Sequence, residues 1–141
     1  NLSGGFFLAQ EVARRMLAAP GPHYRSITFV TSVSARLASP DRADYCISKA
    51  SASMAAQALA LRLAPHNIGV FELRPGIIET AMTGPVKEKY DARIADGLVP
   101  MGRWGQPADI GQAVIPLVTG QMAFATGAVI PVDGGLSIER L

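Results

Sequence analysis

The sequence predicts an α/β domain of the doubly wound class, built on a parallel β-sheet. Segments with helical spacing of apolar residues alternate along the chain with short runs rich in β-branched residues. The 141 residues are 49% hydrophobic, 17% charged and 6% aromatic, with a mean hydropathy of +0.24. This composition can bury a core of aliphatic side chains and argues against intrinsic disorder.

The first three predicted elements are helix, strand and helix. Apolar residues recur at helical spacing over residues 1–17, and a Pro-Gly-Pro cluster at residues 20–22 ends this helix. Residues 26–33 are rich in β-branched residues and show little strict alternation, which is typical of a parallel strand buried on both faces. An Ala-rich helix is expected over residues 44–63, with Asp44 as its N-cap.

Two more strands are expected at residues 69–73 and 128–132. The polar segment at residues 83–96 between them is expected to be partly helical, and a helix opened by Pro107 is expected to run to about Val118. Three strands are few beside a mean of about five to six per sheet. The chain also starts without methionine, so we expect a portion of a larger polypeptide whose remaining strands complete the sheet.

Charge, hydropathy and cysteine content exclude several classes of function. The net charge of +2 comes without a basic stripe, so nucleic-acid binding is not expected. The most apolar long window, residues 46–64, contains Lys49, Gln57 and Arg62, so no membrane span or membrane partner is predicted. The single cysteine cannot form an internal disulfide, which fits a reducing compartment, and a cytoplasmic location is expected.

Tyr45 and Lys49 are the first candidates for chemistry. They stand four residues apart on a predicted helix, so their side chains share one face. An ammonium group beside a phenol stabilises the phenolate, which would let Tyr45 exchange protons near neutral pH. Taken alone, a Tyr-x-x-x-Lys pair also fits an ordinary helix surface.

Ser32 lies at the carboxyl end of the first predicted strand, where open parallel sheets bind their ligands. Its hydroxyl can donate to a carbonyl oxygen, and Ser34 is the competing candidate. The second strand ends in a loop, residues 74–80, in which Gly76 would allow close approach of a ligand and Thr80 offers a hydroxyl. A plain strand-ending turn is the alternative for this loop.

The sequence predicts neither a metal site nor a phosphate-binding turn. The two histidines, His23 and His66, lie in predicted loops without further ligands, so no metal site is predicted. No glycine cluster follows a strand and opens a helix, so the phosphate-binding turn of a dinucleotide site is absent from this sequence.

These motifs resemble, in order and nearly in spacing, the C-terminal half of a short-chain dehydrogenase/reductase, most closely the 3-oxoacyl-acyl-carrier-protein reductase-like members. The matching parts cover nearly the whole chain and are Asn1, Ser32, residues 45–49, residues 75–80, residues 102–110 and residues 126–135. The resemblance implies the C-terminal part of a Rossmann-type domain, with the N-terminal nucleotide-binding half absent from this chain. Residues 1–141 would then form one partial domain that carries the catalytic and nicotinamide side of the site.

The resemblance also implies a catalytic role for four residues. Tyr45 would be the general acid in reduction and the general base in oxidation, while Ser32 would position the substrate oxygen. Lys49 would assist Tyr45 and hold the nicotinamide ribose. Asn1 would complete a tetrad by holding a proton-relay water.

A cofactor-binding loop follows from the same resemblance, with NAD or NADP as the cofactor. The loop begins at Pro75 and Gly76, the Ile78 backbone and Thr80 would contact the carboxamide, and the turn from Thr80 to Met82 would lie close to phosphate. The substrate would be a small carbonyl or alcohol compound, with 3-oxoacyl thioesters among the candidates. Residues 81–101 would form a flap over it.

The resemblance implies a homo-oligomer, a tetramer, built through helices at residues 2–19 and 44–63. Small residues on several faces of the second helix also fit a subunit contact, with packing inside one subunit as the alternative. A second class of function remains open, in which the chain is a non-catalytic fragment or interaction module with little affinity for NADH or NADPH. A third is a scaffold or regulator that keeps the fold, against which Ser32, Tyr45 and Lys49 argue.

Overall fold

The structure is a computed structural model that describes residues 3–140. Its centre is a parallel sheet in the order β1–β2–β3, formed by β1 (Arg25–Val30), β2 (Ile68–Pro75) and β3 (Val129–Val132). The predicted α/β class with parallel strands is therefore confirmed.

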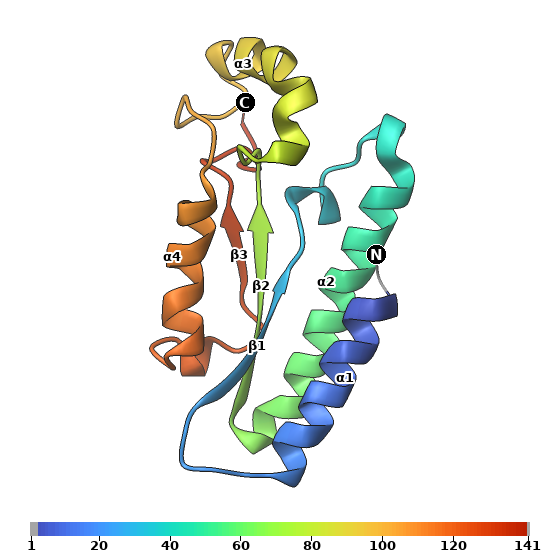
Figure 1. Cartoon of the computed structure of the whole chain (residues 1–141), viewed down its shortest axis with the longest axis vertical. Helices are drawn as coiled ribbons and strands as arrows, with labels where there is room; N and C mark the ends of the chain where they lie inside the picture. Colours follow the sequence, from blue (N-terminus) through green and yellow to red (C-terminus); the bar gives the residue numbers. More distant parts are fainter. Residues whose placement is uncertain (1–2, 141) are drawn as a thin grey trace.

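Helices cover both faces of this sheet (Figure 1). α1 (Ser3–Ala18) and α2 (Ala43–Leu63) lie side by side on one face, and α4 (Pro107–Val118) lies on the other. All three strands point toward the same end of the molecule. There, the 3₁₀ helix η4 (Ala81–Val86) and α3 (Lys87–Ala95) form a partly helical segment, as the sequence predicts.

The central strand β2 supplies the core on both faces. Its residues 68–73 are all buried, and successive side chains alternate between the two faces of the sheet. Val70 packs in the cluster formed with α1 and α2, whereas Phe71 and Leu73 pack with Leu117 of α4. A third, smaller cluster joins Trp104 to the segment that carries α3.

The first strand is shorter than predicted. β1 ends at Val30, and residues 33–35 form a 3₁₀ turn, η1 (Val33–Ala35). Ser32 caps this turn, because its Oγ accepts a hydrogen bond from the Ser34 N–H at 3.1 Å. This cap takes the chain out of the extended conformation, so the β-branched Val33 does not belong to the strand.

Asp44 is not the N-cap of α2. The chain enters this helix through a 3₁₀ turn, η2 (Pro40–Arg42), and Arg42 occupies the cap position. Asp44 lies in the first helical turn, where a carboxylate is still favourable because of the helix dipole. The remaining elements lie within two residues of the predicted boundaries over the residues described.

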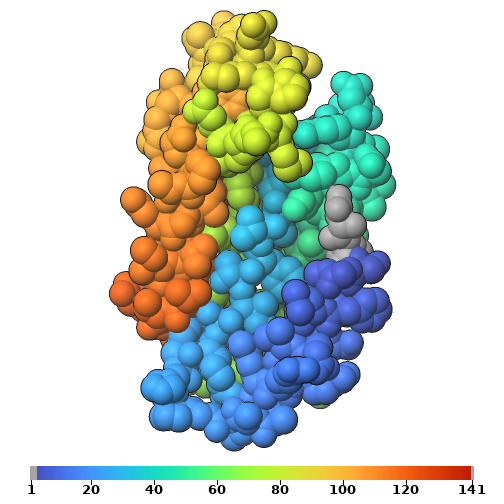
Figure 2. Space-filling view, in the orientation of Figure 1, coloured from blue at the N-terminus to red at the C-terminus, as the bar shows by residue number. Residues whose placement is uncertain are grey.

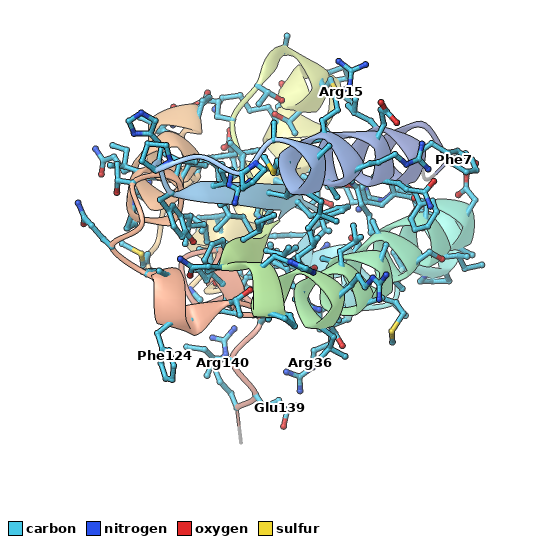
Figure 3. All side chains as sticks on the ribbon, turned by 90° about the horizontal axis from the view of Figure 1, so that it is seen from below. Phe7, Arg15, Arg36, Phe124, Glu139 and Arg140 are labelled. Atoms are coloured by element: carbon cyan, nitrogen blue, oxygen red, sulfur yellow. The ribbon has the colours of Figure 1, made fainter. Side chains whose placement is uncertain are left out.

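The segment after β3 contacts two other parts of the chain through its last residues. Arg36, just beyond η1, forms an ion pair with Glu139, and Figure 3 shows these two side chains near each other. Arg140 donates to the carbonyls of Gly97 and Leu98 at 3.2 and 3.3 Å.

Within residues 3–140, no helix combines the length and apolar character needed to cross a membrane.

Candidate functional site

The candidate site lies where β1 and β2 end. Val30 pairs with Leu73, and the Thr31 N–H donates to the Leu73 carbonyl at 2.9 Å, so the loops that follow the two strands start side by side. Figure 2 shows a notch between the segment of η4 and α3 and the N-terminal part of α2, above these strand ends. Predicted site residues from three elements border this region.

Ser32 enters the site as a buried side chain, with only 8% of its surface exposed. Its Oγ accepts the bond from the Ser34 N–H, and no acceptor for its own hydroxyl proton is found within residues 3–140. The hydroxyl therefore remains able to donate to an incoming oxygen. Ser34 is equally buried at 8%, and its N–H serves to hold Ser32 in place.

Tyr45 and Lys49 are the third and seventh residues of α2. Lys49 Nζ lies 5.5 Å from the centre of the Tyr45 ring and 3.5 Å from the Val30 carbonyl oxygen, to which it donates. That second contact brings the Tyr45–Lys49 face of α2 to the end of β1, two residues before Ser32. The structure thus places the end of α2 that carries Tyr45 and Lys49 near the turn that Ser32 caps. In the described part of the chain, Lys49 forms no salt bridge.

Arg42 is a second cation at Tyr45 that the sequence analysis missed. Its Cζ lies 5.1 Å from the centre of the Tyr45 ring. Arg42 lies outside α2, at its N-cap, so helical spacing in the sequence provided no signal for this contact. Two cationic side chains therefore lie within about 6 Å of the centre of the Tyr45 ring.

Gly76 stands in the expected loop, where a packing contact also requires a glycine. A Cβ atom built on Gly76 would lie 2.7 Å from both Cα and Cβ of Asp133. The Gly76 N–H also donates to the Val132 carbonyl at 3.1 Å. The Cβ side of Gly76 therefore faces the chain after β3, so a packing requirement accounts for the glycine.

Ile78 is held by a short parallel bridge to Gly105. The Gly105 N–H donates to the Ile77 carbonyl, and the Glu79 N–H donates to the Gly105 carbonyl, each at 2.9 Å. Because both bonds flank Ile78, its own N–H and C=O point away from Gly105. These are the groups expected to contact a carboxamide.

Thr83 organises the turn that follows, and the sequence analysis did not predict it. Its hydroxyl donates to the Ile78 and Thr80 carbonyls at 3.0 and 2.9 Å and accepts from the Thr80 N–H at 2.9 Å. Thr80 caps η4 and is exposed, whereas the Met82 side chain is 91% exposed and packs against little. The predicted site residue Asn1 lies outside the described residues.

Glu79 connects the loop to the elements around it. It accepts from Lys87 Nζ of α3 at 2.8 Å and from Gln106 Nε2 at the start of α4 at 2.9 Å. These hydrogen bonds hold the pKa of Glu79 below its usual value, and the bond from Lys87 contributes most. One carboxylate thus fastens α3 and α4 to the loop.

A second set of polar contacts fixes the turn before α4. Arg103 donates to both carboxylate oxygens of Asp109, at 2.8 and 3.0 Å, and the Gln106 N–H donates to the same carboxylate at 2.7 Å. These hydrogen bonds, mainly those from Arg103, lower the pKa of Asp109 to about 2. Trp104 Nε1 donates to Asp91 of α3 at 2.6 Å. The buried Trp104 therefore packs against this region and is anchored to α3.

A cavity of about 370 Å³ lies on the Asp133 side of the loop. Ile78, Arg103, Asp109 and Asp133 are among the residues that line it, whereas Ser32, Tyr45 and Lys49 are not. The candidate chemical groups therefore lie outside this cavity.

No group of three or more metal-ligating side chains is found within residues 3–140.

Comparison with known proteins gives consistent results. Residues 1–137 match the family described as Enoyl-(Acyl carrier protein) reductase. The 3-oxoacyl-[acyl-carrier-protein] reductase FabG of Thermotoga maritima is 36% identical over 138 residues, which cover 98% of this chain and 54% of that protein. The chain thus spans about half the length of the curated relatives it matches.

Solved structures show the same relationship. A 3-oxoacyl-[acyl-carrier protein] reductase from Brucella melitensis in complex with NAD superimposes with a TM-score of 0.97 and 53% identity, covering 99% of this chain and 56% of that one. A gluconate 5-dehydrogenase from Burkholderia cenocepacia in complex with NADP and tartrate gives 0.88 and 30%, covering 97% and 53%. Fold, motif order and these relatives agree, and the chain belongs to the short-chain dehydrogenase/reductase family, of which it represents the C-terminal part of the Rossmann-type domain.

Proposed function

We propose that the complete protein containing this chain is an NAD(P)-dependent oxidoreductase that interconverts a carbonyl compound and its alcohol. The observation that carries this proposal is that the α2 face with Tyr45 and Lys49 reaches the end of β1, near the turn that Ser32 caps. A hydroxyl donor, a phenol and an ammonium group in one place can bind a carbonyl oxygen and move a proton to it. The relatives that are 3-oxoacyl-[acyl-carrier-protein] reductases favour a 3-oxoacyl thioester as substrate.

In the reduction direction, Tyr45 donates its phenolic proton to the substrate oxygen as the carbonyl carbon becomes an alcohol carbon. Ser32 donates a hydrogen bond to the same oxygen, which orients the carbonyl group. The phenolate left on Tyr45 then takes a proton from solvent, while the ammonium group of Lys49 lies 5.5 Å from the centre of its ring. In oxidation the same groups run in reverse, with Tyr45 as the base.

The residues of the loop after β2 are suited to hold a nicotinamide group. Bound NAD(P) supplies the hydride in reduction and accepts it in oxidation. The Ile78 N–H faces away from Gly105 and offers a donor to a carboxamide. The Ile78 carbonyl accepts from Thr83 at 3.0 Å and has a second lone pair for the same carboxamide. Lys49, without a carboxylate partner in the described part of the chain, has N–H groups left for ribose hydroxyls. The cofactor site and the tetrad member Asn1 remain proposals that follow the family resemblance.

The isolated 141-residue chain is proposed to be inactive, because the Gly-rich turn that binds the pyrophosphate is missing from its sequence. Titration of the isolated chain with NADH, followed by cofactor fluorescence, tests this. Tight binding would contradict the claim that half of the cofactor site lies elsewhere. An isolated chain that instead binds another protein would favour the interaction-module alternative.

Tyr45→Phe in the complete protein tests the reaction. The loss of general acid–base catalysis by the phenol should lower kcat by at least about 10²-fold. Reduction of acetoacetyl-coenzyme A, a 3-oxoacyl thioester, by NADH and by NADPH is the assay. The thermal unfolding midpoint and the Kd for the reduced cofactor should stay close to those of the unaltered protein.

Tyr24→Phe is the matched control, because it removes a phenolic oxygen that has no hydrogen-bond partner within the described residues. This variant should retain its kcat. If Tyr45→Phe keeps most of the activity, Tyr45 is not the acid and the proposed function is wrong.

A further inference from the structure

The most unusual side chain outside the proposed chemistry is Glu72. It lies in the middle of the central strand with 1% of its surface exposed, where the neighbouring positions Phe71 and Leu73 are apolar. A carboxylate at such a position requires hydrogen-bond partners, since burial of an unpaired charge is costly. The strand alternation turns Glu72 toward α2, away from the core that contains Phe71.

Both carboxylate oxygens of Glu72 have two donors. Oε1 accepts from Thr31 Oγ1 at 2.5 Å and from Arg74 Nε at 2.8 Å. Oε2 accepts from Ser53 Oγ at 2.7 Å and from Arg74 Nη2 at 3.3 Å, and Arg74 Nη2 also donates to Ser53 Oγ at 2.8 Å. Burial alone would raise the pKa of Glu72, but the hydrogen bonds from Arg74, Thr31 and Ser53 outweigh it and keep that pKa low.

Each partner of Glu72 adjoins a different part of the proposed site. Thr31 directly precedes Ser32. Ser53 lies one helical turn after Lys49 on α2. Arg74 directly precedes Pro75, where the loop after β2 begins. One buried carboxylate therefore links the three segments that carry the hydroxyl donor, the phenol with its lysine, and the cofactor loop.

Stability is a weak reason for such an arrangement. Apolar side chains of similar volume often match or exceed the stability of a buried ion pair, whereas hydrogen bonds with a fixed direction define how segments sit against one another. The two partners Thr31 and Ser53 are 5% exposed, so their hydroxyls have little access to water as an alternative partner. The network is thus suited to alignment.

We propose that Glu72 is a positioning residue that sets the placement of Ser32, of the Tyr45–Lys49 face of α2 and of the loop after β2 relative to one another. This inference rests on the proposed function. A reaction that needs a phenol, a hydroxyl and a cofactor ring around one carbon is sensitive to such alignment, because a displacement of about 1 Å can cost about 10²-fold in rate. Glu72 itself touches neither substrate nor cofactor.

The test uses variants that each remove one hydroxyl group that donates to Glu72 and keep the Glu72–Arg74 ion pair. Thr31→Val removes the hydroxyl that links Glu72 to β1, and Ser53→Ala removes the one that links it to α2. In the complete protein, each should lower kcat for acetoacetyl-coenzyme A about tenfold, because the reacting groups lose alignment. The KM for the reduced cofactor should change less than about twofold, since binding contacts remain.

The isotope effect on hydride transfer gives a second readout. With reduced cofactor deuterated at the transferred position, a misaligned site should make hydride transfer more strongly rate-limiting, so the isotope effect on kcat should rise. Thr28→Val is the matched control, because the buried Thr28 hydroxyl has no partner within the described residues. This control should leave both kcat and the isotope effect unchanged.

Concentrations of active molecules are taken from titration with reduced cofactor, so that loss of folded protein does not imitate loss of kcat. If Thr31→Val and Ser53→Ala lower the unfolding midpoint while kcat per active molecule equals that of Thr28→Val, Glu72 is only structural and the inference is wrong. Glu72→Gln should lower kcat further, since its amide would direct an N–H toward Arg74 in either orientation.

Hydrogen exchange separates failure of this inference from failure of the proposed function. Thr31→Val and Ser53→Ala should speed amide exchange in residues 31–36 and 45–53 by at least tenfold, and Thr28→Val should not. If the unaltered protein reduces no 3-oxoacyl thioester, the proposed substrate fails, while faster exchange still supports alignment by Glu72. Unchanged exchange together with unchanged kcat would overturn the inference.

Discussion

Gly76→Ala gives the sharpest test of how the loop after β2 is held. The added Cβ would lie 2.7 Å from Cα and Cβ of Asp133, about 0.7 Å inside the 3.4 Å at which ordinary contact begins. Asp133 cannot retreat easily, because its carboxylate accepts from the Gly135 N–H at 2.9 Å and from the Ser137 N–H and hydroxyl at 3.0 and 2.5 Å. The loop that carries Ile78 must therefore move.

The expected cost follows from two opposing effects. Overpacking against a fixed backbone costs about 1–3 kcal/mol, and replacing glycine stabilises by about 0.4–1 kcal/mol through the unfolded chain. Gly76→Ala should therefore destabilise the complete protein by about 1–2 kcal/mol. A displacement approaching 1 Å at Ile78 should also lower kcat/KM about tenfold or more.

Urea unfolding followed by circular dichroism measures the first effect, and acetoacetyl-coenzyme A reduction measures the second. Gly111→Ala in α4 is the matched control, since nothing lies within 4 Å of its added Cβ, and it should stabilise by about 0.5–1 kcal/mol. If Gly76→Ala is as stable as Gly111→Ala and keeps its kcat/KM, the contact with Asp133 does not constrain the loop. Unchanged stability with lost cofactor binding would instead support the sequence prediction that Gly76 makes room for a ligand.

Two further predictions concern stability. Leu117 is fully buried between α4 and β2, so Leu117→Ala should lower the free energy of unfolding by about 2–5 kcal/mol in urea titrations, whereas Ile115→Ala, at a 53% exposed position of the same helix, should change it little. The pKa of Asp109 is lowered from 3.8 to about 2 by Arg103, so the ionised group stabilises the fold above pH 3.8 and loses this effect as the pH falls toward 2. Asp109→Asn should therefore be less stable than the parent at neutral pH and converge with it near pH 2; an equal gap at both pH values would contradict this.

Sequence patterns predicted the elements best where one local signal was sufficient. The helix α4 runs from Pro107 to Val118 as expected, since proline suits the first helical position and Asp109 closes a capping box with Gln106. The predictions for the end of β1 and for the N-cap of α2 were wrong, because both places depend on short 3₁₀ turns. Such turns are stabilised by single bonds, as at Ser32, and leave no periodic pattern in the sequence.

The chemical residues of the site were easier to predict than the residues that hold them. Tyr45 and Lys49 share a helix face by spacing alone, and Ser32 stands at a strand end. Glu72 gave no such signal, because a glutamate within an apolar strand is ordinarily interpreted as an exposed or edge position. Only the alternation of Glu72 and Arg74 indicates a pair on one face, and their partners come from segments about 20 and 40 residues away.

The contacts described above divide the site into groups that act and groups that align. The hydroxyl of Ser32 and the phenol of Tyr45 remain available for a ligand, whereas Lys49 is also tied to the Val30 carbonyl and Ile78 is bridged to Gly105. Within residues 3–140, each aligning contact described above joins two residues of this chain. Since fixed placement of reacting groups lowers the barrier to reaction, these contacts favour the proposed chemistry. Affinity for the cofactor then depends on the segment that supplies the pyrophosphate turn, so variants in that segment should change KM for the cofactor more than kcat, in contrast to variants around Glu72.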